Sequence, residues 1–123
     1  MQKKVLIVDD ESGVRHILSS SIANLNYVVV EAENGASALE KIASEKPNLV
    51  LIDVLMPVMD GFQLIEEVRI KQKNPVPFII LSNFDQPEEV SKGMALGAID
   101  YIVKAKMSLK EIMAKIKNAL KDD

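Results

Sequence analysis

Charged and hydroxyl side chains stand directly after four of the five short apolar runs in this sequence. They are Asp9 and Asp10 after residues 5–8, Asp53 after residues 49–52, Ser82 after residues 78–81, and Lys104 after residues 101–103. If these runs are parallel strands of an open α/β sheet, their carboxyl ends lie where such sheets bind ligands. The spacing therefore predicts one site made of three carboxylates, one hydroxyl and one ammonium group.

A bare cluster of three carboxylates is unfavourable, because the like charges repel one another. A divalent cation relieves that repulsion, and Mg²⁺ favours oxygen ligands, often one or two carboxylates together with a phosphate. Lysine can supply a positive charge to phosphoryl oxygens, and serine can donate its hydroxyl to them. Phosphoryl transfer depends mainly on positioning and charge neutralisation. We therefore expect a Mg²⁺-assisted phosphoryl site.

The elements that must position this site alternate along the chain. Five runs rich in Val, Ile and Leu predict strands at residues 5–8, 27–30, 49–52, 78–81 and 101–103. Most of these runs are continuously apolar, which is typical of strands covered by helices on both faces. Strands that alternate with helical segments predict a doubly wound parallel sheet. We expect a (βα)₅, flavodoxin-like α/β fold with strand order 2-1-3-4-5.

Five segments of helical periodicity follow these runs. Their predicted apolar faces are Val14, Ile17, Leu18, Ser21, Ile22 and Leu25; Ala38, Leu39, Ile42 and Ala43; Gly61, Leu64, Ile65 and Val68; a thin stripe after Pro87; and Leu109, Ile112, Met113, Ile116 and Leu120. Ser108 and Glu111 form a capping-box pattern before the last helix. Pro87 suits the first turn of the fourth helix, and Gly97 suits the position just after its end.

At these residues the chain resembles the receiver domains of two-component response regulators (the CheY-like superfamily). The resemblance rests on the acidic pair Asp9–Asp10, on the D-x-x-M-P-x-x-D-G segment from Asp53 to Gly61, on Ser82, and on G-A-x-x-Y-x-x-K from Gly97 to Lys104. It covers essentially the whole chain, so residues 1–123 are expected to form one receiver domain. The order and strand-end positions of these pieces make the match specific.

The resemblance implies a role for each of these residues. Asp53 would accept the phosphoryl group, Asp10 would bind Mg²⁺ directly, and Asp9 would bind it through water. The backbone carbonyl of Leu55 would be a further metal ligand. Lys104 and Ser82 would contact the phosphoryl oxygens, and Tyr101 would be an aromatic switch. The partners implied are a sensor histidine kinase or phosphotransfer protein and an unknown output domain or target, with weak dimerisation possible on phosphorylation.

Two residues depart from the receiver pattern. Ala105 follows Lys104 where the family usually has a proline after a cis peptide bond. A cis bond before a non-proline residue costs about 2.5–4 kcal/mol, so the loop is expected to be trans or strained, which puts the direction of Lys104 in question. Asn83 stands where the family usually has a smaller residue, and its side chain could narrow access to Asp53.

Composition excludes several other functions. The net charge is −3, which gives no basic footprint for nucleic acid. The chain has no cysteine, so it has neither disulfides nor thiolate chemistry. No run approaches the ~20 apolar residues of a membrane span, and we expect a cytoplasmic protein with no membrane contact. The only histidine, His16, is expected to face solvent.

The sequence leaves two alternatives open. A flavin-binding electron carrier of the same architecture would need a phosphate-cradling loop after the first strand, but this chain has Asp9, Asp10 and Glu11 there. A receiver-like scaffold that is never phosphorylated is the other alternative, because of the altered loop after Lys104. The expected activity is that of a phosphoacceptor signalling domain, with weak self-phosphorylation from small donors and autodephosphorylation, rather than that of an enzyme.

Overall fold

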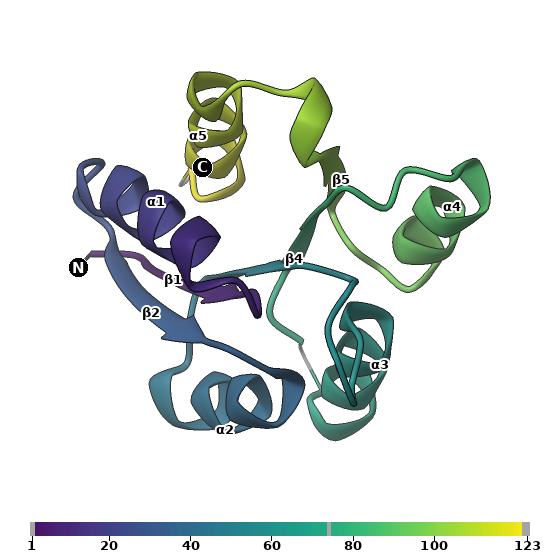
Figure 1. Ribbon diagram of the computed structural model, residues 1–123. Helices are drawn as coiled ribbons and strands as arrows, with labels where there is room; N and C mark the ends of the chain where they lie inside the picture. Colours follow the sequence, from purple (N-terminus) through teal and green to yellow (C-terminus); the bar gives the residue numbers. More distant parts are fainter. Residues whose placement is uncertain (1, 74, 122–123) are drawn as a thin grey trace.

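Strands and helices alternate along the whole chain, as the computed structural model shows for residues 2–73 and 75–121 (Figure 1). The strands are β1 (Lys4–Val8), β2 (Val28–Ala32), β3 (Leu49–Ile52), β4 (Phe78–Ser82) and β5 (Asp100–Val103). The helices are α1 (Ser12–Ala23), α2 (Gly35–Glu45), α3 (Gly61–Lys71), α4 (Pro87–Ala95) and α5 (Leu109–Ala119), with a short 3₁₀ turn, η1 (Lys104–Lys106), before α5.

The strands form one parallel sheet in the order β2-β1-β3-β4-β5, which confirms the predicted topology. Three strands extend by one residue beyond the predicted apolar runs, to include Lys4, Ser82 and Asp100. The second strand is shifted: Tyr27 lies outside it and it continues to Ala32. These polar ends differ from the prediction because hydrophobicity reports side-chain burial, whereas strand bounds depend on backbone pairing.

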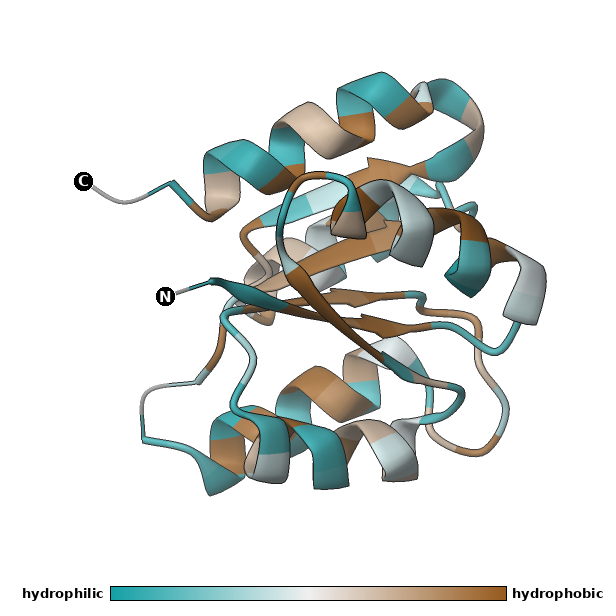
Figure 2. Ribbon diagram, turned by 90° about the vertical axis from the view of Figure 1, so that its left-hand side faces the viewer, coloured by the Kyte–Doolittle hydropathy of each residue, from teal (hydrophilic) through white to brown (hydrophobic). Residues whose placement is uncertain are grey.

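Helices cover both faces of the sheet, and Figure 2 shows the apolar strands between two layers of helices. Helices α1 and α5 pack against one face through a core that includes Leu18, Ile22, Ile112 and Ile116. The other face carries a second core with residues from α2 and α3, and Tyr101 and Leu96 pack against it beside α4. β1 and β3 are therefore buried almost completely, as continuously apolar strands require.

Side-chain caps set the starts of three helices. Asn34 caps α2, whereas Asp60 and Ser108 form capping boxes with Gln63 and Glu111 at the starts of α3 and α5. The predicted Ser108–Glu111 box is thus confirmed, and a hydrogen bond from the Ser108 N–H lowers the pKa of Glu111. Such caps satisfy backbone N–H groups that have no acceptor within the helix.

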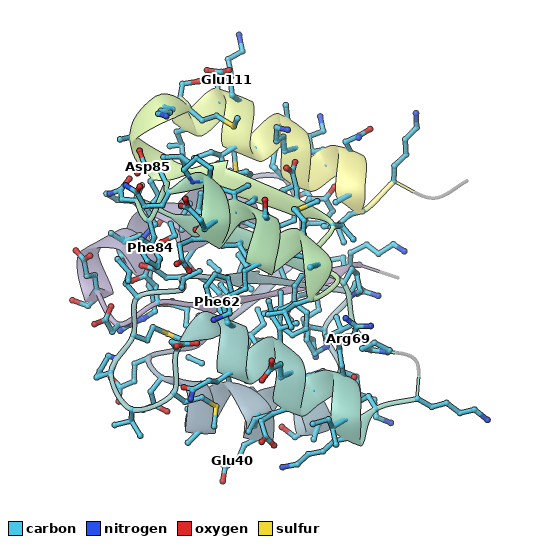
Figure 3. All side chains as sticks on the ribbon, turned by 90° about the vertical axis from the view of Figure 1, so that its right-hand side faces the viewer. Glu40, Phe62, Arg69, Phe84, Asp85 and Glu111 are labelled. Atoms are coloured by element: carbon cyan, nitrogen blue, oxygen red, sulfur yellow. The ribbon has the colours of Figure 1, made fainter. Side chains whose placement is uncertain are left out.

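Helix α4 begins at Pro87, as predicted, and Gly97 follows its end with a φ of 103°. This backbone conformation favours glycine. The guanidinium of Arg69, at the end of α3, donates to the carbonyl of Leu96 beside it, and Figure 3 shows Arg69 below the end of α4. The end of α4 is therefore tied to α3 by a side chain.

Three predicted core positions are wrong. Ile17 is 57% exposed, Leu109 is 41% exposed, and Ala43 is also exposed. Ile17 is adjacent in sequence to buried Leu18, and successive residues point about 100° apart around a helix. The buried stripe of α1 is therefore narrower than the apolar pattern indicated. Within the described residues, the structure contains no helix with the length and hydropathy needed to cross a membrane.

Candidate phosphoacceptor site

The backbone places two carboxylates side by side at the carboxyl end of the sheet. Asp9 directly follows β1, and its N–H donates to the carbonyl of Ala32 at 3.2 Å. Asp53 directly follows β3, and its N–H donates to the carbonyl of Val8 at 3.0 Å. The backbone at both positions is thus fixed by a hydrogen bond to the neighbouring strand. This is the edge where an open α/β sheet binds its ligands.

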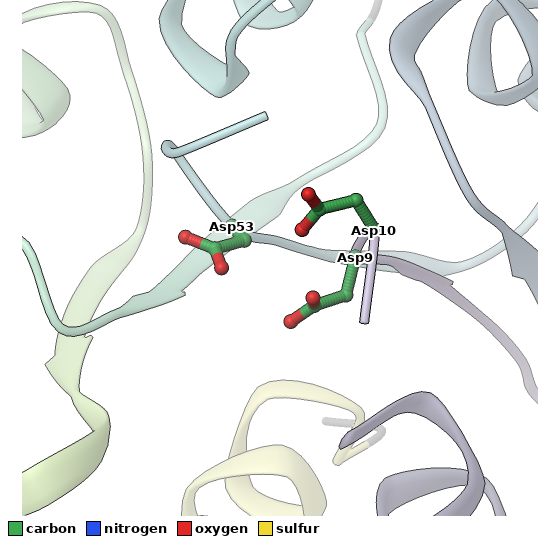
Figure 4. Close-up of side chains that lie close together, drawn as sticks. All are labelled: Asp9, Asp10 and Asp53. Atoms are coloured by element: carbon green, nitrogen blue, oxygen red, sulfur yellow. The ribbon is translucent and has the colours of Figure 1, made fainter. Parts of the chain in front are cut away.

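Three carboxylates meet at this edge, as Figure 4 shows. One oxygen from each of Asp9, Asp10 and Asp53 lies within 4.8 Å of the others. Asp9 and Asp53 are buried, whereas Asp10 is exposed. Carboxylate oxygens are the ligands that Mg²⁺ prefers, and the exposed side of the cluster leaves room for the waters it usually keeps. The residues present therefore fit a Mg²⁺ ion.

Each buried carboxylate is held in the same way. One oxygen of Asp9 accepts the N–H of Glu11 at 2.9 Å, and one oxygen of Asp53 accepts the N–H of Leu55 at 3.1 Å. In both cases the donor lies two residues further along the chain, an arrangement that aspartate readily adopts in turns. The turn fixes the carboxylate plane and leaves the second oxygen of each aspartate for the site.

Lys104 bridges these second oxygens. Its Nζ lies 2.8 Å from Oδ2 of Asp9 and 3.1 Å from Oδ2 of Asp53. Burial lowers the pKa of Lys104, but the hydrogen bond to Asp9 and the charges of Asp53 and Asp9 outweigh burial and raise it above 10.5. Lys104 is therefore an ammonium ion at neutral pH, and it offsets part of the negative charge of the cluster.

Ser82 ends β4 and is fully buried. Its Oγ accepts the N–H of Phe84 at 3.2 Å, so the hydroxyl oxygen is engaged within its own loop. Tyr101 is half-buried on β5, and its hydroxyl donates to the carbonyl of Phe84. Burial, followed by the charges of Glu89, Asp53 and Asp85, raises the pKa of Tyr101 to about 12.

The loop after Lys104 is trans: no cis peptide bond occurs among the described residues. The substitution of Ala105 for the usual proline does not turn Lys104 away, since its ammonium group contacts both buried aspartates. Asn83 accepts the N–H of Ala105 through Oδ1 at 2.9 Å. The two residues that depart from the receiver pattern are thus in direct contact.

Three features of the site were not predicted from the sequence. Arg15 on α1 donates to the carbonyl of Asp9 at 2.6 Å and pairs with Glu31 at 3.3 Å. Gly61 lies against the backbone of Asp53, so that an added Cβ would come within 2.6 Å of the Asp53 carbonyl oxygen. The third feature is the contact between Asn83 and Ala105. His16 is exposed, as expected.

Comparisons with known proteins agree with this architecture. The model of the response regulator receiver domain family matches residues 5–117. A probable transcriptional regulator ycf27 from Porphyridium aerugineum is 39% identical over 98% of this chain and 50% of its own length. The alkaline phosphatase synthesis transcriptional regulatory protein PhoP of Bacillus subtilis is 36% identical over 98% of this chain and 50% of its own length.

Solved structures give the same result. The chemotaxis protein CheY4 of Vibrio cholerae matches with a TM-score of 0.89 at 30% identity, over 98% of this chain and 100% of that one. The BeF₃-activated receiver domain of Klebsiella pneumoniae RstA matches with a TM-score of 0.88 at 28% identity, over 98% of this chain and 100% of that one. The chain belongs to the response regulator receiver domain family, a class of signalling domains. It spans about half the length of the curated relatives named above.

Proposed function

We propose that this chain is a phosphorylation-dependent switch in which Asp53 accepts a phosphoryl group. The observation that supports this most strongly is the geometry of Asp53 itself. Its carboxylate is 6% exposed, fixed by the N–H of Leu55, and paired with an ammonium group beside two further carboxylates. A nucleophile held rigidly among charged groups is the arrangement that phosphoryl transfer requires.

In the proposed reaction, an oxygen of Asp53 bonds to the phosphorus atom as the bond from phosphorus to the donor breaks. The donor leaves with that electron pair, and Asp53 becomes an acyl phosphate. Asp10, Asp53 and the carbonyl of Leu55 would hold Mg²⁺, and Asp9 would bind it through water. When bound, the metal supplies positive charge that neutralises the phosphoryl oxygens.

Lys104 would exchange part of its contact with Asp53 for the phosphoryl oxygens, because it already lies 3.1 Å from the acceptor carboxylate. Ser82 would turn its hydroxyl from the N–H of Phe84 toward the phosphoryl group. Since the hydroxyl of Tyr101 bonds the carbonyl of Phe84, a movement of this loop would also move Tyr101. The face formed by α4, β5 and α5 would then report phosphorylation to a partner.

The partners that fit this reaction are a sensor histidine kinase or a phosphotransfer protein as donor, and an output domain or target protein as receiver of the signal. The two curated relatives named above are called transcriptional regulators, which supports a regulatory output. We propose that residues 1–123 form one receiver domain, with weak self-phosphorylation from small donors, autodephosphorylation and weak dimerisation on phosphorylation. The acidic net charge of −3 favours a domain that does not itself bind nucleic acid.

The experiment that tests this proposal is incubation with acetyl phosphate and Mg²⁺, followed by intact-mass measurement. Wild type should gain one phosphoryl group, and removal of Mg²⁺ with EDTA should prevent the gain. Asp53→Asn should gain none, whereas Asp100→Asn, a matched change of an aspartate on β5 paired with Lys115, should behave as wild type. A wild type that gains no phosphoryl group would instead support a receiver-like scaffold that is not phosphorylated.

A further inference from the structure

The backbone immediately after Lys104 is held by a side chain from a different loop. The N–H of Ala105 donates to Oδ1 of Asn83 at 2.9 Å, across 22 residues of sequence. Ala105 is the second residue of the η1 turn, and Val103, which precedes the turn, provides no side-chain cap. N–H groups in the first turn of a helix lack acceptors within the helix, and asparagine is among the residues that satisfy them best.

Asn83 is well placed to act as a fixed support. It follows Ser82, which is fully buried and pairs with Val103 in the register between β4 and β5. Asn83 and Lys104 therefore leave the sheet side by side, each one residue beyond that pair. Lys104 is anchored on one side by the pairing of β5, and the bond from Ala105 to Asn83 anchors it on the other side.

Two other contacts tie the loop after β4 to residues near Lys104, but neither holds the backbone beside Lys104. Lys106 lies 3.8 Å from Asp85, and both side chains are exposed, so this ion pair is expected to contribute little. The hydroxyl of Tyr101 bonds the carbonyl of Phe84 from within β5. Figure 3 shows Phe84 and Asp85 together in the loop between β4 and α4.

We propose that Asn83 is a positioning residue for Lys104. Its amide oxygen holds the N–H of Ala105 and so fixes the backbone from which Lys104 reaches Asp9 and Asp53. Lysine is a flexible chain that ends in a point charge, and its direction therefore depends on where its backbone is held. The chemical consequence rests on the proposed function, whereas the contact and its effect on Lys104 do not.

The first test measures the contact in the unphosphorylated protein by NMR. Asn83→Ala should expose the amide of Ala105 to water, which would make the temperature coefficient of its proton chemical shift more negative. Asn83→Asp retains Oδ1 and should keep the wild-type coefficient. The ε-methylene signal of Lys104 should also shift in Asn83→Ala but not in Asn118→Ala, which removes an exposed asparagine from α5. An unchanged Lys104 signal in Asn83→Ala would overturn the proposal.

The second test measures the rate of phosphorylation by acetyl phosphate with Mg²⁺. Asn83→Ala should lower the rate constant about three- to tenfold, which corresponds to weakening the contact of Lys104 with the phosphoryl group by about the worth of one hydrogen bond. The effect should vanish in a Lys104→Ala background and in an Ala105→Pro background, which lacks the N–H. An equal loss in those backgrounds would contradict the proposed route through Lys104.

The two tests separate this inference from the proposed function. If wild type gains no phosphoryl group, the proposed function fails, and the NMR signals of Ala105 and Lys104 still decide whether Asn83 positions the lysine. If wild type is phosphorylated and Asn83→Ala reacts at the same rate, the proposed function stands and this inference is wrong.

Discussion

Removal of the Lys104 ammonium group should destabilise the fold, because two buried carboxylates would lose their shared counter-ion. Asp9 and Asp53 are 2% and 6% exposed, and Nζ of Lys104 lies 2.8 and 3.1 Å from them. Breaking a buried ion pair by removing one partner typically costs about 3–5 kcal/mol. This cost is lower here, because one side of the cluster is exposed and water there can solvate the remaining charges. We expect Lys104→Met to lower the free energy of unfolding by about 3 kcal/mol at neutral pH.

The assay is urea denaturation followed by far-ultraviolet circular dichroism, with and without Mg²⁺. Lys106→Met is the matched control, because Lys106 forms an exposed ion pair with Asp85, with Nζ 3.8 Å from Oδ2. Its loss should change the free energy of unfolding by less than about 0.5 kcal/mol. Mg²⁺ should stabilise Lys104→Met more than wild type, since the cation binds more tightly to a cluster that has lost its ammonium group. Equal losses in the two lysine variants, or no extra effect of Mg²⁺ on Lys104→Met, would refute this account of the charges.

Three further predictions follow from the same structure. Gly61→Ala should lower the free energy of unfolding by about 2 kcal/mol in urea denaturation, because its Cβ would lie 2.6 Å from the carbonyl oxygen of Asp53. Gly13→Ala is the control: its Cβ would meet nothing within 4 Å, so it should stabilise the protein slightly. Equal behaviour of the two variants would contradict the close packing at Gly61. Val58 is fully exposed with a φ of 70°, so Val58→Gly should raise stability by about 1 kcal/mol in the same assay, and a loss would show that this backbone is not strained. The pKa of Tyr101 is raised from 10.0 to about 12, so the stability that its protonated hydroxyl contributes is complete below pH 10.0 and is lost as the pH rises through about 12. Urea midpoints measured across this interval should fall more steeply in wild type than in Tyr101→Phe.

The fold was predictable because its strands are buried on both faces. Continuous apolar runs located all five strands, and their alternation with helices predicted a parallel doubly wound sheet. The strand order, which the structure confirms, was instead taken from the flavodoxin-like fold. The ends of the strands were predicted less accurately, since Ser82 and Asp100 pair in the sheet although they are polar. Ile17 was misplaced because an apolar side chain at the margin of a helical stripe can face solvent.

The acidic cluster was predictable because it depends only on where parallel strands end. Asp9, Asp53 and Lys104 meet for that reason. The contact between Asn83 and Ala105 was not predictable, because it depends on the paths of two loops that no periodic pattern specifies. The sequence identified these two residues as departures from the receiver pattern, but only the structure shows that they are hydrogen-bonded to each other.

We propose that Asp53, rather than a neighbouring carboxylate, accepts the phosphoryl group. An aspartyl phosphate is reduced by borohydride to homoserine, whereas a free aspartate is not, so the acceptor can be identified by peptide mass spectrometry. After treatment with acetyl phosphate and Mg²⁺ and then with borohydride, homoserine should be found at position 53 and not at positions 9 or 10. Homoserine at either of those positions, or at none of the three in a protein that has gained a phosphoryl group, would contradict the account.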